Sequence, residues 1–266
     1  MRDEDISKWI DNFDPDGDPP DLHSTFDPGN GDSIIDIIIK FCEELNSRLS
    51  TLTQRGPSTL DVFEEEQDLK AEYIGQETHT FLRQFLIEPI VESLGYSFLI
   101  EPRPAQIERI IWSDDVYPDL RLLPRNWPEN EPVPTIIVEH KMFGRYKYAS
   151  KELREDYLQK ADKQVFGIAT DILRWGTFEV TEDGEINPLE RASLGRPLRK
   201  IRESVEHDDF ELKRERLEIE RLLRLFESIP GNIQHGWIQS GFDIKCAEIF
   251  VLVGLDWNHF DSRYAF

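Results

Sequence analysis

Cysteine is scarce in this chain of 266 residues, and long apolar runs are absent. The two cysteines, Cys42 and Cys246, lie far apart and have no Cys or His partners at metal-ligand spacing, so we expect neither a disulfide scaffold nor a zinc site. No apolar run approaches the roughly 18 residues that span a bilayer. Residues 1–18 also contain no apolar signal core. We therefore expect no membrane association and a cytoplasmic location.

Positive charge is also in short supply. The chain has 31 Lys and Arg against 53 Asp and Glu, which gives a net charge of −22. Such a surface repels polyanions in general. The acidic residues are spread along the chain instead of forming a tail, which favours a halophilic, salt-rich setting over a protein that avoids nucleic acid. At molar salt the screening length falls to roughly 3 Å, so only close basic contacts would act on a polyanion.

The chain divides into four segments. Residues 1–32 are rich in Asp, Pro and Gly, and we expect a flexible acidic arm there. Residues 33–64 hold an N-terminal helix and a linker, and residues 65–182 form the main domain. Residues 183–266 are expected to form a largely helical extension, because apolar residues recur at helical spacing between 208 and 229.

The element order within 65–182 predicts an α/β domain with a mixed sheet. A helical pattern from Glu64 to Leu94, with a bend near Gly75 or Pro89, opens the domain. Three strand-like segments, a polar helix and two further strands follow in that order. Their ranges are 96–102, 109–124, 135–141, 150–163, 165–172 and 175–181.

A carboxylate and an amine end the strand at 135–141. Alternate side chains of a strand face the same side, so Glu139 and Lys141 project from one face. His140 then points to the other face, away from the site, and we expect His79 to lie in solvent. An antiparallel neighbouring strand would bring Asp119 beside Glu139.

Two converging carboxylates, Asp119 and Glu139, can hold Mg²⁺ or Mn²⁺, with water and phosphate oxygens completing the coordination shell. Such an ion lowers the pKa of bound water, and Lys141 can orient or deprotonate that water. Hydrolysis of a phosphodiester needs these parts. The alternative is that Glu139 and Lys141 form a surface ion pair and that Asp119 is a turn residue.

Residues 117–120, YPDL, and 136–141, IIVEHK, resemble the PD-(D/E)xK restriction-endonuclease-like superfamily. The sequence is most similar to the N-terminal nuclease domain of type I restriction enzyme motor subunits and their stand-alone relatives. This resemblance implies a restriction-endonuclease-like mixed sheet flanked by helices at 65–182. It also implies a Mg²⁺-dependent endodeoxyribonuclease from a restriction-modification or other defence setting, with DNA as its substrate. No phosphate-binding loop of a motor is present, so a motor or specificity subunit would be a separate chain.

The resemblance assigns further residues. Glu77, in the helix that opens the domain, is implied as a third metal ligand, and Glu88 is its rival. Tyr157 matches the Tyr of the group's Gln-x-x-x-Tyr element and is implied as a nucleic-acid contact. Leu153 stands where the Gln of that element belongs.

A second element of the resemblance is ATDILRWGTFEV, residues 169–180, which is similar to the group's strand–turn–strand element. Thr170 and Trp175 are in register with it. Asp171 and Ile172 replace its Asn-Gly, which we expect to change the turn.

Basic residues gather beside the proposed site. Cations there can contact phosphates, while the interleaved Tyr146 and Tyr148 pack on sugars or bases. The candidate nucleic-acid-binding cations are Arg121, Arg145, Lys147 and Lys151.

Two other functions stay open at this point. An RNA-directed or repair nuclease would use the same residues. A catalytically silent nuclease-like fold, acting as a binding or assembly module, is favoured by the missing Gln and the acidic surface. The apolar stripe between 212 and 229 also leaves a homodimer interface open.

Overall fold

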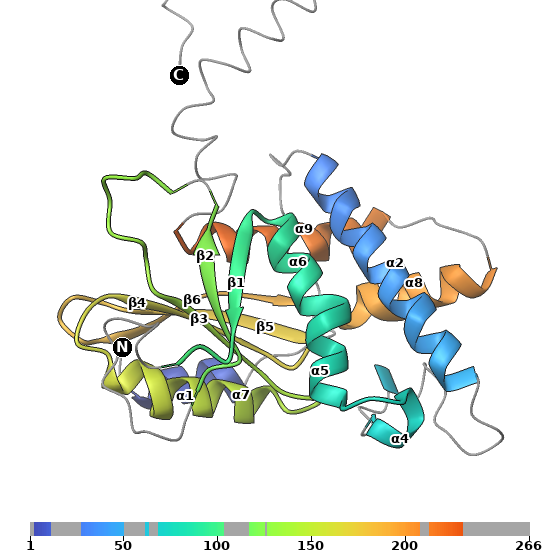
Figure 1. The fold of residues 1–266 in the computed structure, drawn as a ribbon, viewed down its shortest axis with the longest axis horizontal. Coiled ribbons are helices and arrows are strands. Elements are labelled where there is room, and N and C mark those ends of the chain that lie inside the picture. The colour runs from blue at the N-terminus through green and yellow to red at the C-terminus, as the bar shows by residue number, and fades with distance from the viewer. Residues whose placement is uncertain are drawn as a thin grey trace, which may run out of the picture.

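The computed structural model describes residues 3–11, 28–50, 62–63, 69–103, 117–125, 127–207 and 213–230 (Figure 1). These residues form a six-stranded mixed sheet with helices on both faces, which confirms the predicted mixed α/β class. Parts of three predicted segments lie outside the described residues. They are residues 12–27 of the arm, 109–116 of the second strand and 231–266 of the C-terminal extension. Every helix in the described ranges is too short or too polar to traverse a bilayer.

The six strands lie in the sheet in chain order. Neighbouring strands are antiparallel except for β3 and β4, which are parallel. A parallel pair needs a crossover connection, and a helix supplies it here. The strands are β1 (Tyr96–Ile100), β2 (Leu120–Pro124), β3 (Ile136–His140), β4 (Val165–Thr170), β5 (Arg174–Val180) and β6 (Ile186–Ser193).

The helices form two layers, one on each face of the sheet (Figure 1). The larger layer is built from α2 (Pro28–Ser50), α4 (Ala71–Ile74), α5 (Thr78–Leu82), the π-helical turn η1 (Arg83–Ile87), α6 (Glu88–Ser93), α8 (Gly195–His207) and α9 (Lys213–Glu227). The smaller layer is built from α1 (Asp3–Asp11), α7 (Tyr146–Glu152), the π-helical turn η3 (Leu153–Tyr157) and the 3₁₀ turn η4 (Leu158–Lys160).

The side chains of β3 show how the two layers are separated. Ile136 and Val138 pack in the hydrophobic cluster of the larger layer, while Ile137 packs with α1 and α7. This alternation is the period of two that a strand imposes. Because both faces are covered, β3 is buried along its whole length.

The helical pattern predicted from Glu64 to Leu94 is interrupted once within residues 69–94. Gly75, at φ 72°, ends α4 in the left-handed conformation that Gly adopts without steric cost. This is one of the two bends that the sequence predicts. Pro89 follows the π-helical turn η1, and the helix continues through it into α6 without a break.

The predicted domain boundary at residue 182 does not coincide with the edge of the sheet. β6 pairs antiparallel with β5 and extends the sheet past it, so residues 183–266 are not purely helical. Pro188, Glu190 and Arg191 interrupt the apolar alternation by which a strand is recognised, which is why the sequence does not reveal β6.

The prediction of a flexible arm over residues 1–32 is wrong for residues 3–11, which form the helix α1. Ile6 and Ile10 are buried, and the ring of Trp9 meets the ring of Phe178 edge-on at a centroid distance of 5.4 Å. The guanidinium of Arg191 donates to the carbonyl of Trp9 at 3.1 Å. The spacing of Ile6, Trp9 and Ile10 places all three on one helical face.

This packing predicts the effect of Ile6→Ala. A buried Ile replaced by Ala loses apolar contacts and leaves a cavity, so we expect the free energy of unfolding to fall by at least about 2 kcal/mol. Lys8→Ala, on the exposed side of the same helix, is the control and should have little effect. Chemical denaturation of the three proteins measures the difference. Equal stability of all three would mean that residues 3–11 are the flexible arm that composition suggests.

Candidate metal and catalytic site

Asp119 lies immediately before β2, at the point where that strand meets the end of β3. The antiparallel register pairs Leu120 with Val138, and its continuation sets Asp119 opposite Glu139. The carbonyl of Asp119 accepts a hydrogen bond from the backbone N–H of Glu101 at 3.0 Å. Its Oδ2 accepts one from the backbone N–H of His140 at 2.7 Å. The antiparallel neighbour that the sequence analysis required for Asp119 is therefore present.

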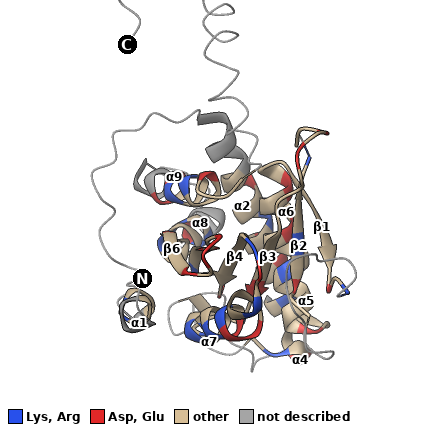
Figure 2. Ribbon diagram, turned by 90° about the vertical axis from the view of Figure 1, so that its left-hand side faces the viewer, with Lys and Arg blue, Asp and Glu red and all other residues tan. Residues whose placement is uncertain are grey.

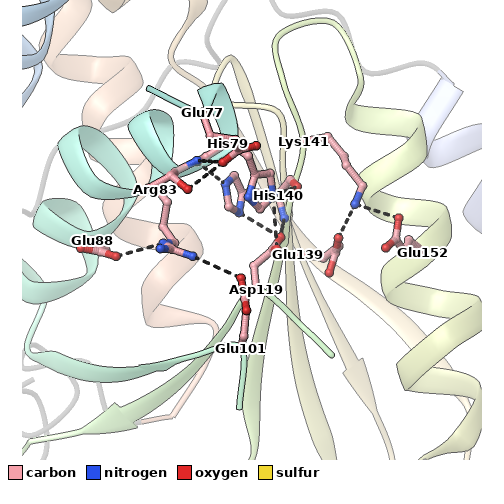
Figure 3. Close-up of polar contacts among 11 residues, drawn as sticks. Glu77, His79, Arg83, Glu88, Glu101, Asp119, Glu139, His140, Lys141 and Glu152 are labelled. Atoms are coloured by element: carbon pink, nitrogen blue, oxygen red, sulfur yellow. Dashed lines mark hydrogen bonds and ion pairs between the residues drawn. The ribbon is translucent and has the colours of Figure 1, made fainter. Parts of the chain in front are cut away.

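From Glu139 to Lys141, at the end of β3, successive side chains alternate between the two sides of the sheet (Figure 3). Figure 3 shows Glu139 and Lys141 on the side of α7, and His140 beside His79 on the side of α5. The predicted separation of His140 from Glu139 and Lys141 is confirmed. Asp119 lies between the two groups and is close to both (Figure 3).

Two histidines contact the carboxylate of Asp119. Nε2 of His79 lies 3.2 Å from Oδ1, and Nδ1 of His140 lies 2.9 Å from Oδ2. The two rings are stacked, with centroids 3.7 Å apart. Together the three residues offer ligand atoms within 4.8 Å of one another and could hold a metal ion.

These contacts correct two expectations. His79 is half-buried against Asp119 instead of solvated, and His140 is fully buried in contact with the same carboxylate instead of remote from the site. Strand alternation correctly predicts the face of His140. It does not reveal that Asp119, the residue before β2, contacts His140 on that face of β3.

On the α7 side, Lys141 joins two carboxylates. Its Nζ lies 2.5 Å from Oε1 of Glu139 and 2.8 Å from Oε2 of Glu152, the last residue of α7. Glu139 is 1% exposed, and its Oε2 is buried without a hydrogen-bond partner among the described residues. A buried carboxylate oxygen without a partner carries a desolvation cost that a bound cation would remove.

The pKa values of Asp119, Glu139 and Lys141 are shifted by burial and by the charges beside them. Burial, and after it the negative charge of Asp119, raise the pKa of Glu139 above its ordinary value, and Lys141 offsets only part of the rise. Burial acts to raise the pKa of Asp119 too, but its contacts with His140 and His79 outweigh burial and hold this pKa well below its usual range. Burial would lower the pKa of Lys141, but Glu139 and its other carboxylate neighbour outweigh burial and raise it. Lys141 is therefore a cation at neutral pH.

The two helix carboxylates that the resemblance implies lie apart from this group. Glu77 is exposed and caps α5, where its Oε2 accepts hydrogen bonds from N and Oγ1 of Thr80 at 2.8 and 2.7 Å. Glu88 accepts a hydrogen bond from Nε of Arg83 at 3.1 Å. Like Glu139, neither carboxylate belongs to the group of metal-capable ligand atoms found in the described residues, which is His79, Asp119 and His140.

Three of the predicted nucleic-acid contacts are withdrawn from the surface, and the first of them is Tyr146, which is buried. Tyr157 is fully buried, which corrects its assignment as a direct contact. It lies on one helical stripe with Ala149 and Leu153, at four-residue steps, and this stripe packs against the sheet. The four-residue spacing in the sequence could have predicted that burial. Arg121 is half-buried within β2.

The remaining predicted cations lie at or in α7, and their side chains are exposed. Arg145 and Lys147 are exposed, and the side chain of Lys151 is 67% exposed, 3.9 Å from the carboxylate of Glu155. Tyr148 between them is 64% exposed. Figure 2 shows basic and acidic residues side by side on α7, so this surface is mixed in charge.

Several hydrogen bonds hold the short turn between β4 and β5. Thr170 pairs with Trp175 in the sheet, and Nε1 of Trp175 donates to the carbonyl of Ile172 at 2.9 Å. Ile172 has φ 77°, a left-handed conformation that costs a β-branched residue more than Gly. Asp171 accepts hydrogen bonds from the backbone N–H groups of Tyr146 and Arg174 at 3.1 and 2.7 Å. This turn therefore fixes the start of α7 beside the end of β3.

Comparisons of this chain with protein-family models, with curated proteins and with solved structures find no match.

The raised pKa of Glu139 predicts an unusual effect of Glu139→Gln on stability. The folded-state pKa exceeds the unfolded value of about 4.3, so wild-type stability falls as pH rises from there towards the folded-state pKa. The Gln variant does not pay this cost, so in a chelator its free energy of unfolding should exceed that of wild type by about 1 kcal/mol or more at pH 8. The difference should shrink at pH 5.

Denaturation at the two pH values measures this effect, with the exposed Glu131→Gln as control. A Glu139→Gln protein that is less stable than wild type at pH 8 would mean that the ion pair with Lys141 outweighs burial and the charge of Asp119.

Proposed function

We propose that this chain is a metal-dependent nuclease that hydrolyses DNA phosphodiester bonds. The observation that carries the proposal is the arrangement of Asp119, Glu139 and Lys141 at one end of the paired strands β2 and β3, with a buried oxygen of Glu139 unpaired within the described residues. Two carboxylates this close, one of them with a raised pKa, favour a bound cation. The order helix, three strands, helix and then β4 and β5, which β6 follows, supports the resemblance to restriction-endonuclease-like nucleases.

Asp119 and Glu139 would hold the metal, which Mg²⁺ or Mn²⁺ suits because both carboxylates are hard oxygen ligands. When bound, such an ion lowers the pKa of water and neutralises charge on a phosphate. Glu139 fits this role because its Oε2 is buried beside Asp119 without a partner in the part of the chain that the structure describes, and the metal would supply one.

Lys141 has an electrostatic role in this proposal. Its raised pKa keeps it protonated, so it orients water or stabilises phosphate charge and does not act as a general base. Glu152 restrains the amine at 2.8 Å, which holds Lys141 near Glu139. Glu152 is a residue that the sequence gives no reason to select.

DNA would approach across α7. Arg145 and Lys147 are exposed there, next to the end of β3, and each contact with a phosphate adds to a salt-dependent affinity. The net charge of −22 opposes this binding at low salt. A separate motor or specificity subunit, in a restriction-modification or other defence system, would supply the remaining affinity.

A second candidate function is a binding or assembly module with a silent site. The observation that favours it is the pair of ion contacts that occupy Lys141, since Glu139 and Glu152 already satisfy the amine. A cleavage assay separates the two functions.

The nuclease proposal predicts that Asp119→Asn and Glu139→Gln each lower metal-dependent cleavage by about 100-fold or more, because each removes a preorganised charge. Plasmid, single-stranded DNA and RNA are incubated with Mg²⁺ or Mn²⁺ at low and high salt. Circular dichroism checks folding, and Glu131→Gln is the control. Wild-type turnover in either site variant would contradict the assignment, and cleavage of RNA alone would contradict DNA as the substrate.

A further prediction concerns Lys141→Met. Loss of the amine should leave magnesium affinity equal or higher, because a competing positive charge beside two carboxylates is gone. Single-turnover cleavage should nevertheless fall severely, because the charge that orients water or stabilises phosphate is missing. Calorimetry and rapid-quench kinetics measure the two quantities, and Lys163→Met, at an exposed lysine without an assigned role, is the control. Retained cleavage would reject Lys141 as a catalytic residue.

A further inference from the structure

A distinct set of metal-ligand atoms lies on the α5 side of β3, opposite to Glu139 and Lys141 (Figure 3). Nε2 of His79 and Nδ1 of His140 lie 3.2 and 2.9 Å from the two carboxylate oxygens of Asp119. The three side chains come from α5, from the residue before β2 and from the last residue of β3. Ligands on helix and strand ends are positioned by the packed core behind them.

The neutral imidazole of His140 has fewer N–H donors than the oxygen atoms that face its two nitrogens. Nε2 lies 3.2 Å from the carbonyl of His79, and Nδ1 lies 2.9 Å from Oδ2 of Asp119, so both nitrogens face oxygen atoms. A neutral imidazole has one N–H and cannot donate at both nitrogens. Within the described residues, Nδ1 makes no aligned hydrogen bond, and His140 is fully buried. A cation that bridges Nδ1 and the carboxylate would resolve this conflict.

The contact at Nε2 of His140 is the one that a metal-binding histidine makes. Such histidines donate their second N–H to a backbone carbonyl or a carboxylate, which sets the tautomer and orients the ring. Here the carbonyl of His79 is that acceptor, and it leaves the lone pair of Nδ1 for an ion.

We propose that His79, Asp119 and His140 bind a divalent cation of the late first-row series, for which zinc is the representative. Two imidazole nitrogens and one carboxylate oxygen match the ligands of Zn²⁺, whereas Mg²⁺ prefers oxygen ligands alone. Three protein ligands leave a fourth position open to water.

Binding requires the stacked histidines to separate. Their rings are 3.7 Å apart and inclined at 21°, so their lone pairs lie in nearly parallel planes, whereas ligands of one ion converge on it. The side chain of His79 is 28% exposed and has room to turn, but that of His140 is not exposed. His79 is therefore the ligand that moves.

Spacing in the sequence conceals this site. His79 and His140 are 61 positions apart, so the absence of Cys and His partners at short spacing, which argued against zinc, does not bear on them. The site shares Asp119 with the proposed hydrolytic site but does not depend on nuclease activity. Zinc and magnesium would compete for that one carboxylate.

The experiment titrates zinc chloride into the metal-free full chain by calorimetry and repeats the titration with cobalt(II), whose visible absorption reports its coordination. We expect one equivalent to bind in wild type. His79→Gln should weaken zinc binding by about 10-fold or more, since loss of even an outer partner costs that much. His207→Gln, at the end of α8, is the histidine control and should bind as wild type. Circular dichroism checks that each variant is folded.

Glu139→Gln separates this site from the proposed hydrolytic one. It should leave zinc affinity unchanged while it weakens magnesium binding. Absence of a zinc equivalent in wild type, or equal zinc affinity in wild type and His79→Gln, would overturn the proposal. A greater loss of zinc binding in Glu139→Gln than in His79→Gln would also overturn it. So would nitrogen NMR of the zinc-loaded chain showing protons on both nitrogens of His140, since an imidazolium would then supply the positive charge.

Discussion

The antiparallel register of β2 on β3 is the constraint on which the candidate site depends. It sets Asp119 opposite Glu139 and lets the backbone N–H of His140 bind Oδ2 of Asp119 at 2.7 Å. A shift by one residue would exchange the two faces of β3 and send Glu139 into the apolar layer of α5 and α6. Ile136, Ile137 and Val138 prevent this shift, because each is fully buried on its own face. The hydrophobic core therefore fixes the positions of the polar groups.

The same arrangement places unfavourable electrostatics inside a buried region. Glu139 loses hydration and faces the charge of Asp119, and Lys141 offsets only part of that cost. A fold selected for stability alone would place apolar side chains here. Both helical segments that cover the site also contain a π-helical turn, η1 beyond α5 and η3 beyond α7. Such turns occur frequently at functional sites, and each is a departure from regular helix that packing must support.

The fold class and the shared face of Glu139 and Lys141 could be predicted from sequence because each depends on local patterns, whereas the place of Asp119 depends on the pairing of β2 with β3. Strand alternation assigns Glu139 and Lys141 to one face, and that assignment does not require knowledge of the neighbours. The role of His79 could not be predicted in this way, since its contacts lie 40 and 61 positions along the chain. The composition of residues 1–32 does not reveal α1, because its short apolar stripe adjoins a run of Asp, Pro and Gly. For Tyr157 the opposite holds, since its helical spacing predicts burial and the motif match predicts a surface contact.

The two proposed metal sites share the carboxylate of Asp119, so the kind of ion that binds would decide which site is occupied. The two carboxylate oxygens of Asp119 each face one of the two imidazoles, and its negative charge also acts on Glu139. Under the two proposals, an ion that prefers nitrogen ligands would be favoured on the α5 side, and an ion that prefers oxygen would be favoured on the α7 side. Because both proposed sites would need the same carboxylate, occupation of one would weaken the other by a coupling that is reciprocal. The supply of the two kinds of metal would then decide which face of β3 is charged, with no large rearrangement of the fold.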